Sequence, residues 1–268
     1  MIYCISKAED NIAKDKSLKL MKRFIKFMTW HHDVQQPHSR FHVVRALKIL
    51  LNELTDDVEI PDVFYEKIQD ALLKRFWDIK SFIRAEAAQA SSRLQSPSDA
   101  DCLIVISLIH LCKYDSSHTV RLAAMQALAI TTKTLPVIIT RCRDVSDLVR
   151  KKSYDLLIKW KILKPLTVSK RLQIMETGLT DKSEIVRRSC IDLLKIWLSA
   201  SNNDPVALLK RLDVESMEES TELTLKTLFN NLNEVEIQSM VDMLVSRMDE
   251  KFVTLMLLYI SPLLSVAW

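Results

Sequence analysis

Basic side chains gather in one stretch of the chain, where they could bind the phosphates of a nucleic acid. Between residues 141 and 171 there are ten Lys or Arg and three Asp or Glu, a net charge of +7. Between residues 211 and 250 there are three Lys or Arg and ten Asp or Glu, a net charge of −7. A local excess of positive charge favours an anionic partner on the first stretch and not on the second.

Six cations in or near the basic stretch are candidate phosphate contacts. They lie where we expect helices to begin, and free amides and the helix dipole favour phosphate there. Such contacts would not depend on base sequence and would weaken with salt. The positions after the corresponding Arg in two earlier segments hold Ala85 and Leu122, so the charge is local. The candidates are Lys151, Lys152, Lys182 and Arg188, with Arg141 and Arg143 in second rank.

Other chemistry finds little support in the sequence. Four of the six histidines are clustered, and His38 and His42 have the i, i+4 spacing of helical metal ligands. No Glu or Cys completes a known motif, however, and Pro37 favours a loop, so we expect no metal and no cofactor. There is no GxSxG, P-loop or HExxH motif, and a chain with one Gly cannot build a glycine-rich phosphate cradle. We therefore expect no catalytic residues and no enzyme.

The cations are positioned by a motif that occurs four times: Asp, four residues, Ile or Val, then Arg. Successive Asp residues lie 37, 29 and 37 residues apart, which is the period of helical-pair repeats. The repetition predicts a solenoid. The four copies are Asp78 with Arg84, Asp115 with Arg121, Asp144 with Arg150, and Asp181 with Arg187.

Each motif is followed by the pattern of an amphipathic helix. A Ser lies two or three residues after each Asp (Ser81, Ser117, Ser146, Ser183), and we expect its hydroxyl to cap a helix there. Positions −1, +3, +6, +7 and +10 from each Arg form one mostly apolar stripe, which we expect to be core. The stripes are Ile83, Ala87, Ala90, Ser91, Leu94; Val120, Ala124, Ala127, Leu128, Thr131; Val149, Ser153, Leu156, Leu157, Trp160; and Val186, Cys190, Leu193, Leu194, Trp197.

This pattern resembles the HEAT repeat, in which the Asp of a turn and the Arg of the second helix form a ladder between neighbours. The eight motif residues are then structural first. One Gly and seven Pro, with 48% hydrophobic residues, also favour helices joined by short turns, so the expected class is an all-α HEAT-repeat solenoid of antiparallel helix pairs.

We expect a single array over residues 1–268. Residues 1–57 would be a degenerate first repeat or cap, in which Arg40 begins a second helix without its Asp. Residues 58–200 would be regular repeats, and 201–268 divergent helices. The run from Leu103 to Leu111 is apolar almost all round and is expected to be buried, and Gly178 is expected to stop a helix.

The chain shows no sign of secretion or of a membrane span. The five cysteines form no CxxC pair, which indicates reduced, mostly buried thiols of the cytosol or nucleus, and Met1 to Lys16 has no secretory signal pattern. The basic amphipathic stretch 17–30 is expected to be a capping or first repeat helix rather than a membrane-surface helix. The apolar residues 252–268 are too few for a span and are expected to form a core helix or an interrupted solenoid end.

From Ser39 to Asp213, about two thirds of the chain, the sequence resembles the CAP-G-type subunits of condensin. The resemblance rests on residues 71–75, 92–97 and 141–145, and above all on residues 178–187 and 192–198. It implies a non-catalytic subunit, in a family of much longer proteins, that binds the kleisin and through it the SMC ATPase subunits. It also implies duplex DNA binding in mitotic chromosome condensation, in the nucleus, on mitotic chromosomes and partly in the cytoplasm.

A second function remains open. A HEAT-repeat scaffold of the transport-receptor or phosphatase-scaffold type would bind proteins without DNA, and a charged stretch is often a solvated face. An enzyme similar to HEAT-like DNA glycosylases is disfavoured. The basic stretch 141–171 favours the DNA-binding alternative.

Overall fold

The described part of the chain is all helical, as the composition predicts. The computed structural model describes residues 11–54, 60–96, 99, 101–161, 166–212, 218–232 and 238, and every regular element within these ranges is a helix. The chain divides into two compact units, Met1–Val137 and Ile138–Trp268. The all-α class is confirmed, whereas the single continuous array stays a prediction.

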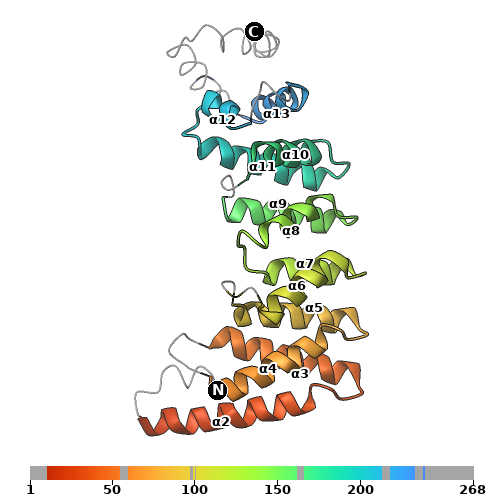
Figure 1. Cartoon of the computed structure of the whole chain (residues 1–268), viewed down its shortest axis with the longest axis vertical. Helices are drawn as coiled ribbons and strands as arrows, with labels where there is room; N and C mark the ends of the chain where they lie inside the picture. Colours follow the sequence, from red (N-terminus) through yellow and green to blue (C-terminus); the bar gives the residue numbers. More distant parts are fainter. Residues whose placement is uncertain are drawn as a thin grey trace. The chain divides into compact units, whose positions relative to one another are not determined.

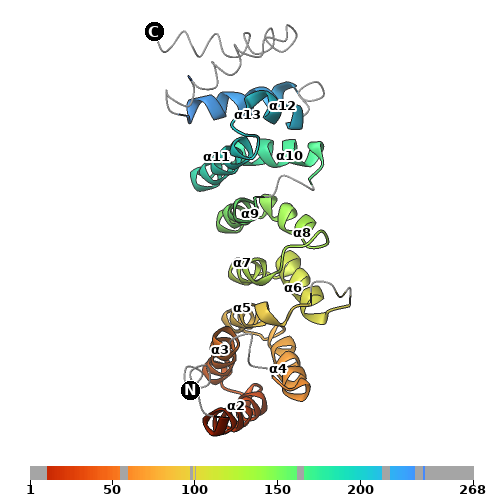
Figure 2. The ribbon, with the colours of Figure 1, turned by 90° about the vertical axis from the view of Figure 1, so that its left-hand side faces the viewer.

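The first unit is built from helices stacked in two columns. In Figure 2, α5 lies between α3 and α7 in one column, and α4 and α6 lie in the other. Each of α4 and α6 also packs against the helix that follows it. The elements are α2 (Asn11–His31), α3 (Pro37–Glu53), α4 (Asp62–Arg75), α5 (Ser81–Ala90), η1 (Ser91–Leu94), α6 (Leu103–Tyr114) and α7 (His118–Ala127).

The second unit repeats this plan with α9 and α11 side by side, as Figure 1 shows in green and teal. The helix α10 packs against α11 and against α12 and α13 beyond it. A short helix, α8 (Leu135–Thr140), spans the boundary between the units. The elements of the second unit are η2 (Arg141–Arg143), α9 (Asp147–Lys159), α10 (Val168–Leu179), α11 (Glu184–Ser199), α12 (Pro205–Leu212) and α13 (Glu218–Asn230).

The predicted core stripes are confirmed with two exceptions. All five stripe positions of α11 are fully buried. The five stripe positions of the first copy, from Ile83 to Leu94, are buried too. Thr131 is only half-buried. Trp160 is wrong as a core residue, since 53% of its surface is exposed at the end of α9. Trp160 is the C-cap residue, one position beyond the end of α9, whereas the equivalent Trp197 lies within α11.

Burial of the whole run from Leu103 to Leu111 was also a wrong expectation. Ile104, Leu108 and Leu111 are buried, but Leu103 and Ile106 are about half exposed on the other side of α6. An apolar residue on every side of a helix does not tell which sides the neighbours cover.

Gly178 lies inside α10 rather than after its end, so its predicted role as a helix stop is wrong. It does not have the positive φ of a left-handed cap. A Cβ at this position would lie 2.5 Å from Cys190 Sγ and 2.6 Å from Tyr154 Oη. Gly178 is required because two buried side chains from α9 and α11 press against the backbone of α10.

Four of the five cysteines are free and buried, as expected: Cys102, Cys112, Cys142 and Cys190. Cys4 and the apolar residues 252–268 lie outside the described residues. In the part of the chain that the structure describes, none of the helices has the length and apolar character needed to cross a bilayer.

Candidate nucleic-acid interface

An arginine–aspartate ladder holds the turns from which the candidate site is built. Nη1 of Arg84 donates to the backbone carbonyls of Asp78 (2.8 Å) and Ile79 (3.2 Å) in its own turn. Its Nε and Nη2 donate to the two carboxylate oxygens of Asp115 in the next turn, at 2.7 and 2.8 Å. One side chain therefore ties two successive turns together through a bidentate ion pair.

Arg40 forms the same rung one repeat earlier. Its Nη1 donates to the carbonyls of Val34 and Gln35, and its Nε and Nη2 reach Asp78 at 2.7 and 3.0 Å. The ladder thus has a rung before Arg84, in the segment where the sequence predicts a degenerate earlier repeat. Val34 occupies the position that Asp has in the later turns. Arg40 needs only the backbone carbonyl of this residue, so a Val can replace the Asp there.

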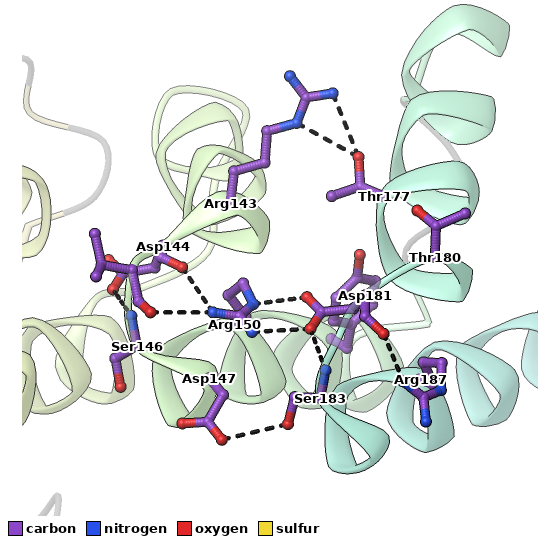
Figure 3. A network of polar contacts seen from close by, with 12 residues as sticks. Arg143, Asp144, Ser146, Asp147, Arg150, Thr177, Thr180, Asp181, Ser183 and Arg187 are labelled. Atoms are coloured by element: carbon purple, nitrogen blue, oxygen red, sulfur yellow. Dashed lines mark hydrogen bonds and ion pairs between the residues drawn. The ribbon is translucent and has the colours of Figure 1, made fainter.

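Figure 3 shows the rung of the second unit, between α9 and α11. Nε and Nη2 of Arg150 donate to the carboxylate of Asp181 at 2.6 and 2.8 Å, and Nη1 donates to the carbonyl of Asp144 at 2.9 Å. Arg187 donates to the carbonyl of Asp181 at 2.6 Å, and its other end reaches Glu184 of its own helix. Arg121 likewise binds the carbonyls of its own turn. The structural role of these residues is confirmed for the three bidentate rungs.

The helix starts are fixed by the ladder Asp, so the predicted capping by Ser hydroxyls is wrong. One carboxylate oxygen of each Asp accepts the backbone N–H of the N-cap residue two positions later, at 2.8 to 3.0 Å. That residue is Lys80 in the first copy and Ser117, Ser146 or Ser183 in the others, and none makes a side-chain cap bond. The Asp thus satisfies the N–H of the N-cap residue itself, which is a different donor from the amides two or three residues further on that a Ser hydroxyl would cap.

The ladder groups are held in their charged forms. Burial is the largest single influence and by itself would raise the pKa of Asp78 and Asp181, but the hydrogen bonds from the Arg side chain and the backbone amide, together with the nearby positive charges, lower both pKa values. The hydrogen bond to the partner Asp raises the pKa of Arg84 and of Arg150. The turns are therefore fixed throughout the physiological pH range.

The structure places all six predicted phosphate contacts in the second unit. Lys151 and Lys152 lie in the second turn of α9 and are half-buried, whereas Lys182 in the next turn and Arg188 on α11 are exposed. Arg141 and Arg143 form η2.

Two side-chain bridges show that α9 lies next to the first half of α11. Ser183 Oγ donates to Asp147 at 3.3 Å, as Figure 3 shows, and Ser189 Oγ donates to Asp155 at 3.2 Å. Lys151 lies between Asp147 and Asp155 on α9, and Arg188 immediately precedes Ser189. The structure thus brings Lys151, Arg188 and Lys182 to one region. Arg143 points instead toward Thr177 of α10, at 3.4 Å.

Sequence reasoning missed the carboxylates that accompany these cations. Lys151 Nζ pairs with Asp155 at 2.8 Å, Arg188 pairs with Glu184 at 3.0 Å, and Arg141 pairs with Asp144. The i, i+4 spacing of the first two pairs was visible in the sequence. The region also exposes apolar side chains at the turns and first helical residues, namely Val145, Leu148 and Ile185.

The predicted loop at Pro37 is wrong, because Pro37 is the first residue of α3, and His38 and His42 share a helix. His38 stacks on Phe82, with ring centroids 6.1 Å apart, and His42 contacts Phe41. Within the described ranges no group of three His, Cys, Asp or Glu has the arrangement of a metal site.

Comparisons with known proteins agree with this architecture. Condensin complex subunit 3 of Xenopus laevis is 33% identical over 205 residues, which are 76% of this chain and 20% of the relative. The human subunit 3 is 32% identical over 79% of this chain and 21% of the relative. A chain in the crystal structure of the S. pombe condensin Cnd3–Cnd2 subcomplex matches with a TM-score of 0.73 and 28% identity, over 85% of this chain and 29% of that chain. No family model matches.

The repeated helix pairs and their Arg–Asp ladder are those of a HEAT-repeat α-solenoid protein. Within that class, the sequence matches show that this chain belongs to the condensin complex subunit 3 family. The chain spans about a fifth of the length of the frog and human relatives.

Proposed function

We propose that this chain serves as a non-catalytic subunit of condensin that binds duplex DNA together with the kleisin subunit in mitotic chromosome condensation. The observation that carries the proposal is the cluster of Lys151, in the second turn of α9, with Lys182 just before α11 and Arg188 in its second turn, in a chain related to condensin subunit 3. The nucleus and mitotic chromosomes, and in part the cytoplasm, are the corresponding locations.

The ladder suits this role because it fixes the backbone from which the cations project. Lys182 follows Asp181 directly, and Asp181 is held by both Arg150 and the amide of Ser183. Lys151 follows Arg150. Cations on a rigid frame lose little entropy when they bind phosphate, and the helix N-termini add favourable dipoles. The ion pairs with Asp155 and Glu184 are partly exposed and therefore weak, so phosphate can replace them.

The partner assignment is supported by the solved relative, which was crystallised as a Cnd3–Cnd2 subcomplex of condensin. We propose that the kleisin subunit binds this chain and connects it to the SMC ATPase subunits. Because the kleisin is the proposed partner, the experiment below is carried out with and without a kleisin segment.

The test is charge reversal at the cluster. Lys151, Lys152, Lys182 and Arg188 are changed together to Glu, and binding to a random duplex is measured by fluorescence anisotropy across a salt series. A variant with four reversals elsewhere in the second unit is the control (Lys159→Glu, Lys170→Glu, Lys195→Glu, Lys210→Glu). We expect the first variant to lose most binding and the control to keep most of it, although both lose the same net charge.

Replacement by Ala gives a second readout. Each phosphate contact that is lost should flatten the slope of log K against log salt by about 0.9, so four lost contacts would change it by up to about 4. Retained affinity and slope in the folded Glu variant, with and without a kleisin segment, would contradict DNA binding at this cluster.

That outcome would favour the second candidate, a HEAT-repeat scaffold that binds proteins and not DNA. The carboxylates interleaved with the cations support this candidate, because Asp155 and Glu184 cancel part of the positive charge of the cluster. The exposed Val145, Leu148 and Ile185 would suit a protein partner.

A further inference from the structure

The helix α2 has a second apolar side that the described part of the chain does not cover. Met21 and Ile25 are fully buried against the rest of the first unit, where α2 packs on α3 and α4 (Figure 1). Leu20, Phe27 and Trp30 are 52%, 55% and 78% exposed. These three lie at i, i+7 and i+10, which is one side of a helix. Exposed apolar side chains gathered in this way mark an interaction surface.

The same side of α2 is strongly basic. From Lys16 to His31 the helix has five Lys or Arg and no Asp or Glu. Arg23 and Lys26 are exposed and lie between the apolar side chains, and neither forms an ion pair among the described residues. Lys16 and Lys19 extend the positive charge toward the start of the helix. We refer to Lys16, Lys19, Leu20, Arg23, Lys26, Phe27 and Trp30 together as the exposed α2 face.

We propose that the exposed α2 face binds an acidic amphipathic helix of a partner protein. The apolar side chains of that helix would pack on Leu20, Phe27 and Trp30, and its Asp and Glu residues would pair with Arg23 and Lys26. From Leu20 to Trp30 the face runs about 15 Å, the length of three helical turns. Tryptophan and arginine are the residues that most often carry binding energy at protein interfaces.

The mixture of residues favours a protein helix over other anionic partners. A DNA duplex presents phosphates but no apolar groups to cover the rings of Phe27 and Trp30. A bilayer would take the apolar side chains, but Arg23 and Lys26 lie among them rather than on an opposite face. Charge complementarity therefore selects a partner that has both carboxylates and apolar side chains on one face.

This proposal does not depend on DNA binding by the second unit, because α2 belongs to the first. It is tested on the full chain with two labelled three-heptad peptides that have Leu at the a and d positions. One peptide has Glu at e and g and the other has Lys there. Fluorescence anisotropy gives the affinity of each peptide for each variant of the chain.

We expect the chain to bind the Glu peptide more tightly than the Lys peptide. The double variant Arg23→Glu with Lys26→Glu should bind the Glu peptide about tenfold or more weakly than the original chain does, and should bind the Lys peptide more tightly. Trp30→Ser should lower the affinity for the Glu peptide to a similar extent. The matched controls are Lys159→Glu with Lys170→Glu, and Trp160→Ser, which change exposed residues of the same kinds in the second unit. These controls should leave both affinities unchanged.

Equal affinity for the two peptides, or no effect of the α2 variants in chains with unchanged helix content, would overturn the proposal. Tighter binding of an oligo(dT) strand, or of vesicles containing phosphatidylserine, would also overturn it if that binding is lost in the same variants. Self-association in sedimentation that disappears with Arg23→Glu and Lys26→Glu would instead identify a second copy of the chain as the partner.

Discussion

Each ladder Asp accepts three kinds of hydrogen bond, and this explains why an acidic residue is buried in the turns. Asp181 accepts both arms of Arg150 and the amide of Ser183, and its own carbonyl accepts Arg187. A buried carboxylate is costly unless its partners satisfy it. Here they do, so the cost appears only when one partner is removed.

Asp181→Ala should therefore lower stability strongly, by about 3 kcal/mol, because Arg150 would stay buried without its counter-charge. Urea unfolding measures the loss. Replacing Arg150 by Met in the same chain should recover part of it. Glu184→Ala, which removes a fully exposed carboxylate, is the control and should leave the urea midpoint nearly unchanged. Equal effects of Asp181→Ala and Glu184→Ala would contradict the structural role of the ladder.

His32 should make the first unit less stable as the pH falls. The ring is buried beside Arg75, with Lys74 and Asp33 near it, and its Nδ1 has no partner among the described residues. Burial, and then the charge of Arg75, lower the pKa of His32 below its ordinary value of 6.5. The unfolded chain therefore binds the proton first, so stability should fall from about pH 7 downward until the folded chain also binds the proton.

The slope of this fall for one proton is at most about 1.4 kcal/mol per pH unit. Urea midpoints measured between pH 7.5 and 5.5, a range chosen around the ordinary histidine value, should fall less in His32→Leu than in the original chain. The exposed His118 offers a control, since His118→Leu should leave the pH dependence as it was. An unchanged pH dependence in His32→Leu would show that other groups cause it.

At the level of helices, two tryptophans at equivalent positions have opposite surroundings. Trp197 of α11 is fully buried, whereas Trp160 at the end of α9 is mostly exposed, with Lys159 Nζ 5.8 Å from the centre of its ring. We expect Trp197→Ala to cost about 3 kcal/mol or more and Trp160→Ala about 0.5 kcal/mol or less. Denaturant unfolding of the two variants decides this. Similar losses would show that Trp160 is covered in solution.

The same pair shows how far the sequence could predict the helices. Periodicity identified the buried stripe of every repeat, because a helix side that recurs in four repeats must face a neighbour in each of them. It could not tell that α9 ends before Trp160 while α11 continues past Trp197, nor which sides of the uniformly apolar α6 remain open. Those facts depend on the lengths and positions of neighbouring helices, and no local pattern records them.

The candidate site was predictable to a similar degree. The positions of Lys151, Lys182 and Arg188 beside helix starts followed from the motif, and the structure agrees. The motif did not show which carboxylates would bind the amides at the helix starts and the cations of the cluster. Asp144 and Asp181 accept the N–H of the N-cap residues, and Asp155 and Glu184 form ion pairs with two of the cations. Competition among nearby acceptors is settled by geometry and not by residue type alone.

For the molecule as a whole, the sequence predicts that the apolar residues 252–268 promote association. They lie outside the described residues, and eleven of the last seventeen are aliphatic or aromatic side chains other than alanine. Ending the chain at Asp249 should therefore raise the monomeric fraction, because the apolar side chains that the sequence predicts to drive association would be removed. Sedimentation velocity at several concentrations measures it. Unchanged or greater association after trimming would refute this expectation.

The ladder has a direction, and this has a consequence for how such chains change in length. Every rung runs from an Arg to the Asp of the following turn, while the same Arg holds its own turn by backbone carbonyls alone. Each 37-residue segment that begins at a ladder Asp, such as Asp78 to Tyr114, thus contains one acceptor for the segment before it and one donor for the segment after it. A tandem duplication cut at that boundary joins donor to acceptor at the one new junction, between the two copies, without any further substitution. A duplication that is not a whole number of repeats can place two Asp or two Arg in succession, and a chain grown in that way would carry an unmatched buried charge.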